Sequence, residues 1–154
     1  MYRSKKTYLI SILIPLAVGG ISALLGMNGM AEYRQLVKPP LAPPGFVFPI
    51  VWTILFIFMG ISSALIFGSR KPERGGALAV YALQLLVNFF WTIFFFRYHW
   101  RLFSFFWIIL LIVLVFFMIR RFRRIDPLAG NLQIPYLLWL IFAAYLNLGV
   151  FFFN

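Results

Sequence analysis

The chain has 154 residues, of which 64% are hydrophobic and 11% are charged, with three acidic side chains against fourteen lysines and arginines. Soluble domains are about 45–50% apolar, so a soluble fold of this size could not cover its surface with so few polar groups. The sequence contains no cysteine, which excludes disulfides, thiolate metal ligands and thiol nucleophiles. The solvent of most of this chain must therefore be membrane lipid.

Five apolar runs follow one another along the chain, and none of them contains a charged residue or a histidine. About 20 residues, each rising about 1.5 Å, cross a hydrocarbon core about 30 Å thick, so each run is long enough to span a membrane as a helix. The runs are residues 8–27, 46–68, 77–96, 102–119 and 134–153. The sequence therefore predicts an all-α membrane protein, a single domain built as a bundle of five transmembrane helices.

The first run follows three basic residues, as the apolar region of a signal peptide would. It is longer than the apolar region of a signal peptide, which usually has about 7–15 residues, and no clear cleavage site of small residues follows it. We therefore expect a retained first helix.

The basic residues lie in the connections between the runs or at their edges, and they are divided unequally between the two sides. Ten lie in the N-terminal segment and in the connections 69–76 and 120–130. The other side has only Arg34, Lys38, Arg97 and Arg101. The positive-inside rule then places the N-terminus in the cytoplasm, with the C-terminus and the 28–45 segment outside, in what we expect to be a bacterial cell membrane. No helix has a basic face with interleaved aromatic rings, so we expect no nucleic-acid partner.

Residues 28–45 form the one long connection between the runs, on the side predicted to be outside. Prolines fix the local backbone φ angle and remove backbone donors. The segment has four of them, Pro39, Pro40, Pro43 and Pro44. We therefore predict an ordered lid over one end of the bundle.

The third run carries polar and aromatic side chains at spacings of three and four residues, which places them on one helical face. They are Tyr81, Gln84, Asn88, Trp91 and Phe95. Two interpretations stay open. The amides could join neighbouring helices by hydrogen bonds, each worth about 1 kcal/mol or less, or the face could line a cavity with donors and rings.

Trp52 in the second run and Trp139 in the fifth each lie a few residues inside their run. Tryptophans at such positions commonly form an aromatic belt at the membrane surface. Small, polar and aromatic residues share their helical faces, however, as in a seam that binds a ligand. The fourth run, 102–119, is almost entirely aliphatic and aromatic and is predicted to be scaffold. Pairs of small residues four positions apart also allow close helix approach, at Gly19/Ala23, Gly60/Ala64 and Gly75/Ala79.

Conventional catalytic groups are absent from the spans. No span holds a carboxylate, so neither an acid–base pair nor a carboxylate proton relay can be drawn there. His99, the sole histidine, lies in a basic turn with no cysteine or carboxylate nearby in the sequence, so no metal site is predicted. Aromatic faces, amides and shape remain, and these favour binding of a large, flat, hydrophobic molecule. Two alternatives to such a binding protein are a scaffold without a ligand and a small transporter of hydrophobic compounds.

Three motifs resemble the tryptophan-rich sensory protein, or translocator protein, family over essentially the whole chain. Residues Glu32–Gly45, EYRQLVKPPLAPPG, are similar to the family's loop motif W-Y-x-x-L-x-K-P-x-W-x-P-P-G, and Trp52 stands at its second-helix tryptophan. QLLVNFFW (Gln84–Trp91) resembles its third-helix pattern Q-x-x-x-N-x-x-W. PYLLWLIFAAYLN (Pro135–Asn147) resembles its fifth-helix signature.

The resemblance implies a five-helix bundle, usually a homodimer, that binds tetrapyrroles such as protoporphyrin IX, as well as synthetic benzodiazepines, in a cavity beneath the first loop. It implies a ligand rather than a required cofactor. The residues it assigns to the cavity wall are Tyr33, Pro43, Trp52, Asn88, Trp91, Trp139, Ala143 and Leu146, to which we add Gln84 from the polar face of the third run. In some members the tryptophans that match Trp52 and Trp139 are implicated in light-dependent porphyrin breakdown. The alternative function is therefore photo-oxidative degradation, with these two as catalytic residues.

The chain departs from the family pattern at two positions of the lid. Glu32 stands in place of the usual tryptophan, and Leu41 replaces the tryptophan of K-P-x-W. Both changes predict a less aromatic lid. No basic residue follows Tyr145, so the weak cholesterol-recognition pattern is missing and sterol transport is not expected.

Overall fold

The computed structural model describes residues 5–26 and 29–154. Its helical elements are α1 (Lys5–Leu25), α2 (Gly29–Gln35), α3 (Val47–Phe67), α4 (Arg74–Thr92), the π-helical segment η1 (Ile93–Arg97), α5 (Arg101–Ile125), α6 (Pro127–Asn131) and α7 (Ile134–Phe153). The predicted end of the first span at Met27, the start of the lid at Asn28, and Arg3 lie outside the described residues.

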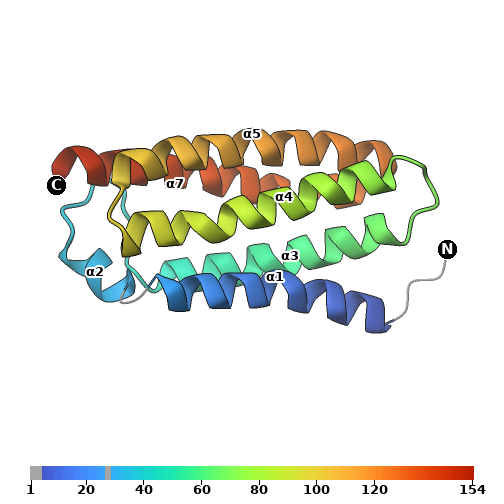
Figure 1. Ribbon diagram of the computed structural model, residues 1–154, viewed down its shortest axis with the longest axis horizontal. Coiled ribbons are helices and arrows are strands. Elements are labelled where there is room, and N and C mark those ends of the chain that lie inside the picture. The colour runs from blue at the N-terminus through green and yellow to red at the C-terminus, as the bar shows by residue number, and fades with distance from the viewer. Residues whose placement is uncertain (1–4, 27–28) are drawn as a thin grey trace.

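Five segments of the described chain are long and apolar enough to cross a membrane, which confirms the predicted all-α bundle. They are Lys5–Leu25, Val47–Phe67, Arg74–Arg97, Arg101–Ile125 and Pro127–Phe153. Figure 1 shows these helices side by side along the long axis, with the start of α1 and the C-terminus at opposite ends. The short helix α2 lies at the end that holds the C-terminus. Which end faces the cytoplasm stays a prediction.

Helix α5 continues to Ile125, beyond the predicted end of the fourth span at Ile119. The 120–130 connection is therefore largely helical, because arginine is a good helix former and its charge is favourable near a helix C-terminus. The helix ends before Pro127, since a proline disfavours helical geometry in the residue that precedes it. The Asp126 carboxylate then caps α6 by accepting from the Leu128 N–H at 3.0 Å.

The third span changes its winding before it ends. α4 stops at Thr92 and the chain continues as the π-helical turn η1, in which the Tyr98 N–H donates to the Ile93 carbonyl at 3.1 Å. A π-helical turn is wider than an α-helical one and is often found beside functional sites. Here it lies at the same end of the bundle as α2, between α4 and α5.

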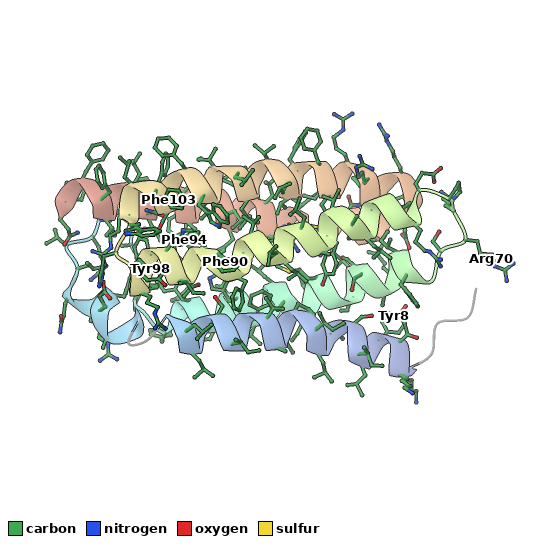
Figure 2. The ribbon with its side chains drawn as sticks, in the orientation of Figure 1. Tyr8, Arg70, Phe90, Phe94, Tyr98 and Phe103 are labelled. Carbon is green, nitrogen blue, oxygen red and sulfur yellow. The ribbon has the colours of Figure 1, made fainter. Side chains whose placement is uncertain are left out.

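An aromatic cluster covers the surface where α4, η1 and α5 meet (Figure 2). Its rings pack edge to face or stack, with centroids 4.9–6.0 Å apart. The members are Phe90, Phe94, Tyr98, Trp100, Phe103 and Trp107. Trp107 also donates its indole N–H to the Val87 carbonyl at 2.7 Å, which joins α5 to α4.

Two glycines let α1 and α3 approach each other closely. A Cβ atom at Gly60 would lie 2.3 Å from the Ile12 Cα atom, and a Cβ atom at Gly19 would lie 2.2 Å from the Phe56 ring. Gly19 and Gly60, which each belong to one of the pairs of small residues, thus serve contacts between helices of the same chain. The homodimer implied by the resemblance stays a prediction.

We expect Gly60→Ala to lower the free energy of unfolding by about 1–3 kcal/mol, because the new methyl group meets helix backbone that can move away only with all of α1. Gly75→Ala is the matched control, since nothing lies within 4 Å of its Cβ position and alanine is the better helix former. Denaturant or thermal unfolding in detergent micelles measures both. Equal stability of the two variants would contradict this account of the α1–α3 contact.

Candidate ligand-binding site

A cavity of about 400 Å³ lies inside the bundle, toward the end that α2 covers. Small-molecule sites commonly occupy about 300–1,000 Å³. Every span contributes to the wall: Leu16, Gly19, Gly20, Ser22 and Ala23 from α1; Phe48, Pro49, Trp52, Thr53 and Phe56 from α3; Asn88, Trp91 and Thr92 from α4; Ile108 and Leu111 from α5; Trp139, Leu140, Ala143, Leu146, Asn147 and Val150 from α7. Tyr33 of α2, with Phe95 and Phe96 of η1, completes it. None of these side chains carries a formal charge.

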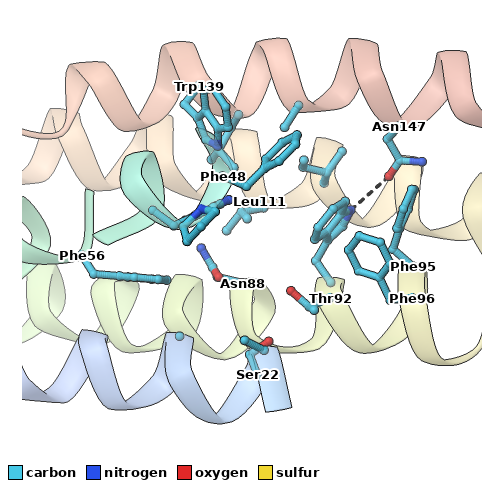
Figure 3. A pocket seen from close by; sticks show the side chains of 18 of the residues that line it. Ser22, Phe48, Phe56, Asn88, Thr92, Phe95, Phe96, Leu111, Trp139 and Asn147 are labelled. Atoms are coloured by element: carbon cyan, nitrogen blue, oxygen red, sulfur yellow. Dashed lines mark hydrogen bonds between the residues drawn. The ribbon is translucent and has the colours of Figure 1, made fainter. Parts of the chain in front are cut away.

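Most of the predicted ligand-binding residues lie on this wall, and Figure 3 shows rings from α3, η1 and α7 that face a shared space. The residues brought together are Tyr33, Trp52, Asn88, Trp91, Trp139, Ala143 and Leu146. Pro43 and Gln84 are not among the wall residues. Both lie behind the wall. Pro43 is bonded to the wall residue Tyr33, and Gln84 is bonded to Tyr136, the partner of the wall residue Asn88.

Pro43 acts through Tyr33. Its carbonyl accepts a hydrogen bond from the Tyr33 hydroxyl at 2.6 Å, and the buried Tyr33 ring packs edge to face against Phe48 at 4.9 Å. Burial raises the pKa of Tyr33, which keeps the hydroxyl protonated as a donor. Pro43 thus fixes the tyrosine that closes the cavity from the lid side.

Gln84 takes part in a hydrogen-bonded chain that joins α4 to α7. The Asn88 Nδ2 donates to the Tyr136 hydroxyl at 2.7 Å, and this hydroxyl donates to the Gln84 Oε1 at 2.7 Å. Both interpretations of the polar face therefore apply, to different residues: Gln84 joins helices, whereas Asn88 joins helices and also lines the cavity. Tyr136, which is fully buried, was missed as a partner although it belongs to the fifth-helix motif.

Trp91 is held by a second amide. Its indole N–H donates to the Asn147 Oδ1 at 3.0 Å, the dashed line in Figure 3. The Asn147 Nδ2 in turn donates to the Arg101 carbonyl at 2.8 Å, and the Trp91 ring stacks on Phe95 at 5.0 Å. One asparagine thus ties α4, α5 and α7 together at the cavity wall.

Trp52 and Trp139 are half-buried and both line the cavity, on facing helices α3 and α7. Trp52 lies 5.5 Å from Phe56 and 6.1 Å from Tyr136, and Trp139 lies 5.7 Å from Phe48, between ring centroids. The Trp139 Nε1 is buried and has no hydrogen-bond partner in the described chain. These positions favour the ligand-seam interpretation over the belt.

Sequence reasoning missed the contribution of α1, whose side chains give no motif of polar or aromatic residues. The sequence feature that could have revealed this contribution is a set of small residues on α1, Gly19, Gly20 and Ala23. Larger side chains at these positions would take up space beside the cavity. Ser22 joins this wall to α4 by donating its hydroxyl to the Phe89 carbonyl at 2.7 Å. The fourth span is also more than scaffold, because α5 supplies Ile108 to the wall.

The middle of the lid is fastened to the C-terminal half of α7 and to Asn154, which follows it. The Tyr145 hydroxyl donates to the Pro40 carbonyl at 2.6 Å, and the Asn154 amide bonds both the N–H and the carbonyl of Val37, at 3.1 and 2.7 Å. Gly149 lets the Pro39 ring approach, since a Cβ atom there would lie 2.4 Å from it. These contacts hold residues 37–40 of the lid against α7.

Glu32 fastens the lid to α5 as well. Its carboxylate pairs with Arg101 and lies 3.0 Å from the His99 Nδ1. His99 has no carboxylate nearby in the sequence, and it is the fold that brings Glu32 to it, because α2 lies against the turn before α5. Where the family motif has an aromatic ring, Glu32 thus forms an ion pair. Leu41, the other departure from the motif, is 84% exposed and has a φ of 71°.

A small polytopic bundle with an uncharged, ring-lined cavity under a fastened lid defines a class of integral membrane protein suited to bind hydrophobic ligands. The sequence profile of the TspO/MBR family matches residues 11–153. The chain belongs to this family.

Named relatives share long stretches of the sequence. The tryptophan-rich protein TspO of Chlorobaculum tepidum is 38% identical over 77% of this chain and 76% of its own length. Protein CrtK of Rhodobacter capsulatus is 35% identical over 78% and 76%. The translocator protein of Ovis aries is 34% identical over 78% and 73%.

We expect Tyr136→Phe to lower the free energy of unfolding by about 1–3 kcal/mol, because two buried amides lose their shared partner. Tyr145→Phe on the same helix is the matched control. Its hydroxyl is exposed, so water can replace the bond to Pro40 and the loss should stay below about 1 kcal/mol. Unfolding of both variants in the same detergent makes the comparison. A larger loss at Tyr145 would contradict the role assigned to the buried chain.

Proposed function

We propose that this protein binds a tetrapyrrole of the protoporphyrin IX type in the cavity, in a sensing, transport or porphyrin-disposal role. The observation that carries the proposal is the wall itself, which combines indole, phenol and phenyl rings from the five elements α2, α3, α4, η1 and α7 and has no charge. A flat, hydrophobic ring system can pack against such faces over most of its area.

Two polar atoms of the wall support a ligand with both donors and acceptors. The buried Trp139 indole N–H has no partner among the residues that the structure describes, and a ligand acceptor would satisfy it. The Asn88 Nδ2 already donates to Tyr136, which leaves its Oδ1 to accept from a ligand.

The names of the relatives support the cellular roles in the proposal. One curated relative, from Cereibacter sphaeroides, is called a tryptophan-rich sensory protein, and those of Ovis aries and Bos taurus are called translocator proteins. Sensing and transport both require reversible binding of a ligand within the membrane, which the lid and the cavity permit.

We expect Ala143→Phe to weaken protoporphyrin IX binding at least about tenfold, because the ring would fill space that the ligand needs. Ala82→Phe is the matched control, since Ala82 lies on α4, is exposed to lipid and does not line the cavity. Titration of the porphyrin into detergent-solubilised protein, followed by tryptophan fluorescence, measures the dissociation constants. Unchanged affinity in a folded Ala143→Phe variant would remove the cavity as the site.

The alternative, photo-oxidative breakdown of the porphyrin, is favoured by the placement of Trp52 and Trp139 on the cavity wall. A bound ring would lie beside both indoles, which could exchange electrons with the photoexcited ring while dioxygen serves as oxidant. We expect light- and oxygen-dependent loss of the porphyrin absorbance, abolished in the Trp52→Phe/Trp139→Phe variant and kept in Trp100→Phe, whose tryptophan is exposed and away from the cavity. Equal bleaching by an unrelated membrane protein would exclude the enzymatic role.

A further inference from the structure

A cation lies beside the uncharged cavity at its lid end. Arg101 begins α5, and its side chain is only 14% exposed. The guanidinium carbon lies 5.1 Å from the centroid of the Phe95 ring, which lines the cavity. The Arg101 carbonyl accepts from Asn147, another wall residue. The guanidinium therefore lies behind the rim of the cavity, in a partly desolvated position where ionic contacts are stronger than in water.

The hydrogen-bonding capacity of this guanidinium is only partly used. Its Nη2 pairs with the Glu32 carboxylate, and the same nitrogen lies 3.3 Å from the His99 Nδ1. The Arg101 Nε is buried and has no partner in the described chain. A guanidinium can engage a carboxylate through two parallel N–H donors, so the present arrangement leaves donor capacity for a second or a better-placed carboxylate.

The charge at this end is unbalanced. The sequence has three acidic side chains, and the other two, Glu73 and Asp126, lie beside α4 and α5 at the opposite end of the bundle. Glu32 thus stands alone on this side against four cations, Arg34, Lys38, Arg97 and Arg101. An apolar cavity with one guanidinium behind its rim, on a side with excess positive charge, is suited to an amphipathic acid, whose ring system enters the cavity while its carboxylate meets Arg101.

We propose that Arg101 is the receptor for a carboxylate on the edge of the ligand, and that Glu32 is an internal competitor for the same guanidinium. This proposal rests on the proposed function and adds to it the side chain that binds the acidic edge of the ligand and the side chain that competes with it. Ligand entry exchanges one carboxylate for another on Arg101. The buried cation is never left unpaired, and this avoids the largest penalty in such sites.

The exchange also couples binding to the lid. Glu32 is on α2 and its side chain is 25% exposed, so its carboxylate can return to water when it leaves Arg101. The lid then keeps its contacts with α7 but loses its ion pair to α5. A ligand without an acidic group cannot displace Glu32 in this way. Because the loop motif has tryptophan at this position, the competitor is a feature of this chain.

The test compares protoporphyrin IX with its dimethyl ester, which has the same ring and no carboxylate, in the full-length protein. We expect Glu32→Gln to raise the affinity for the acid about tenfold and to leave the affinity for the ester unchanged, since the competitor is gone. Arg101→Gln should bring the affinity for the acid down to that for the ester. Arg97→Gln, which removes an exposed cation at the same end, should match the wild-type protein for both.

An acid-to-ester affinity ratio that stays the same in all three variants would overturn the proposal, and so would a weaker affinity for the acid in Glu32→Gln. If Arg101→Gln fails to fold, Glu32→Gln and Arg101→Lys decide, because lysine keeps the charge without the two-donor geometry and should lose most of the preference for the acid. Binding of both compounds with no preference would remove the carboxylate receptor and leave the proposed function standing. Binding of neither to the wild-type protein would remove both.

Discussion

A transmembrane helix gains little by packing apolar side chains against another helix, because the surrounding lipid tails are as apolar as those side chains. Close packing and hydrogen bonds between helices must therefore set the arrangement of this bundle. Five polar side chains within or at the ends of the spans serve this purpose, because each of them donates to an acceptor on a neighbouring helix. The donors are Ser22, Ser62, Asn88, Trp107 and Asn147. A single arrangement of the helices satisfies all of them, and a shift of one helix would leave buried donors unpaired.

The same bonds give the cavity a fixed shape. Trp91 is held by Asn147, and the Asn88 amide by Tyr136, so neither wall side chain has to be ordered when a ligand enters. On the α1 side of the wall, Gly20 leaves open the space that a side chain would occupy, while the wide turn η1 brings Phe95 to the wall. A preformed cavity reduces the entropy that binding must overcome, because few side chains lose freedom.

The lid shows how one substitution changes the character of a site. Where the loop motif has a tryptophan, Glu32 forms an ion pair with Arg101 and thereby places a carboxylate beside an otherwise uncharged cavity. The remaining attachments of the lid, to α7, are backbone and hydroxyl contacts that do not depend on Glu32. The lid is therefore attached in two different ways. Its hydrogen bonds on the α7 side stay in place, whereas its ion pair with Arg101 of α5 can be exchanged for a ligand carboxylate.

The sequence by itself determined the five spans and their order, because about 20 apolar residues without charge have one stable state in lipid, the helix. Its motifs also located Trp52, Asn88, Trp91 and Trp139 on what became the cavity wall. Only the tertiary structure decided that Gln84 bonds to Tyr136 behind the wall, that α1 supplies part of the wall, and that Glu32 meets Arg101, 69 residues away. Helical periodicity shows which side chains share a face of one helix. It does not show which residue of another helix that face meets, because this depends on the rotation and depth at which the helices pack.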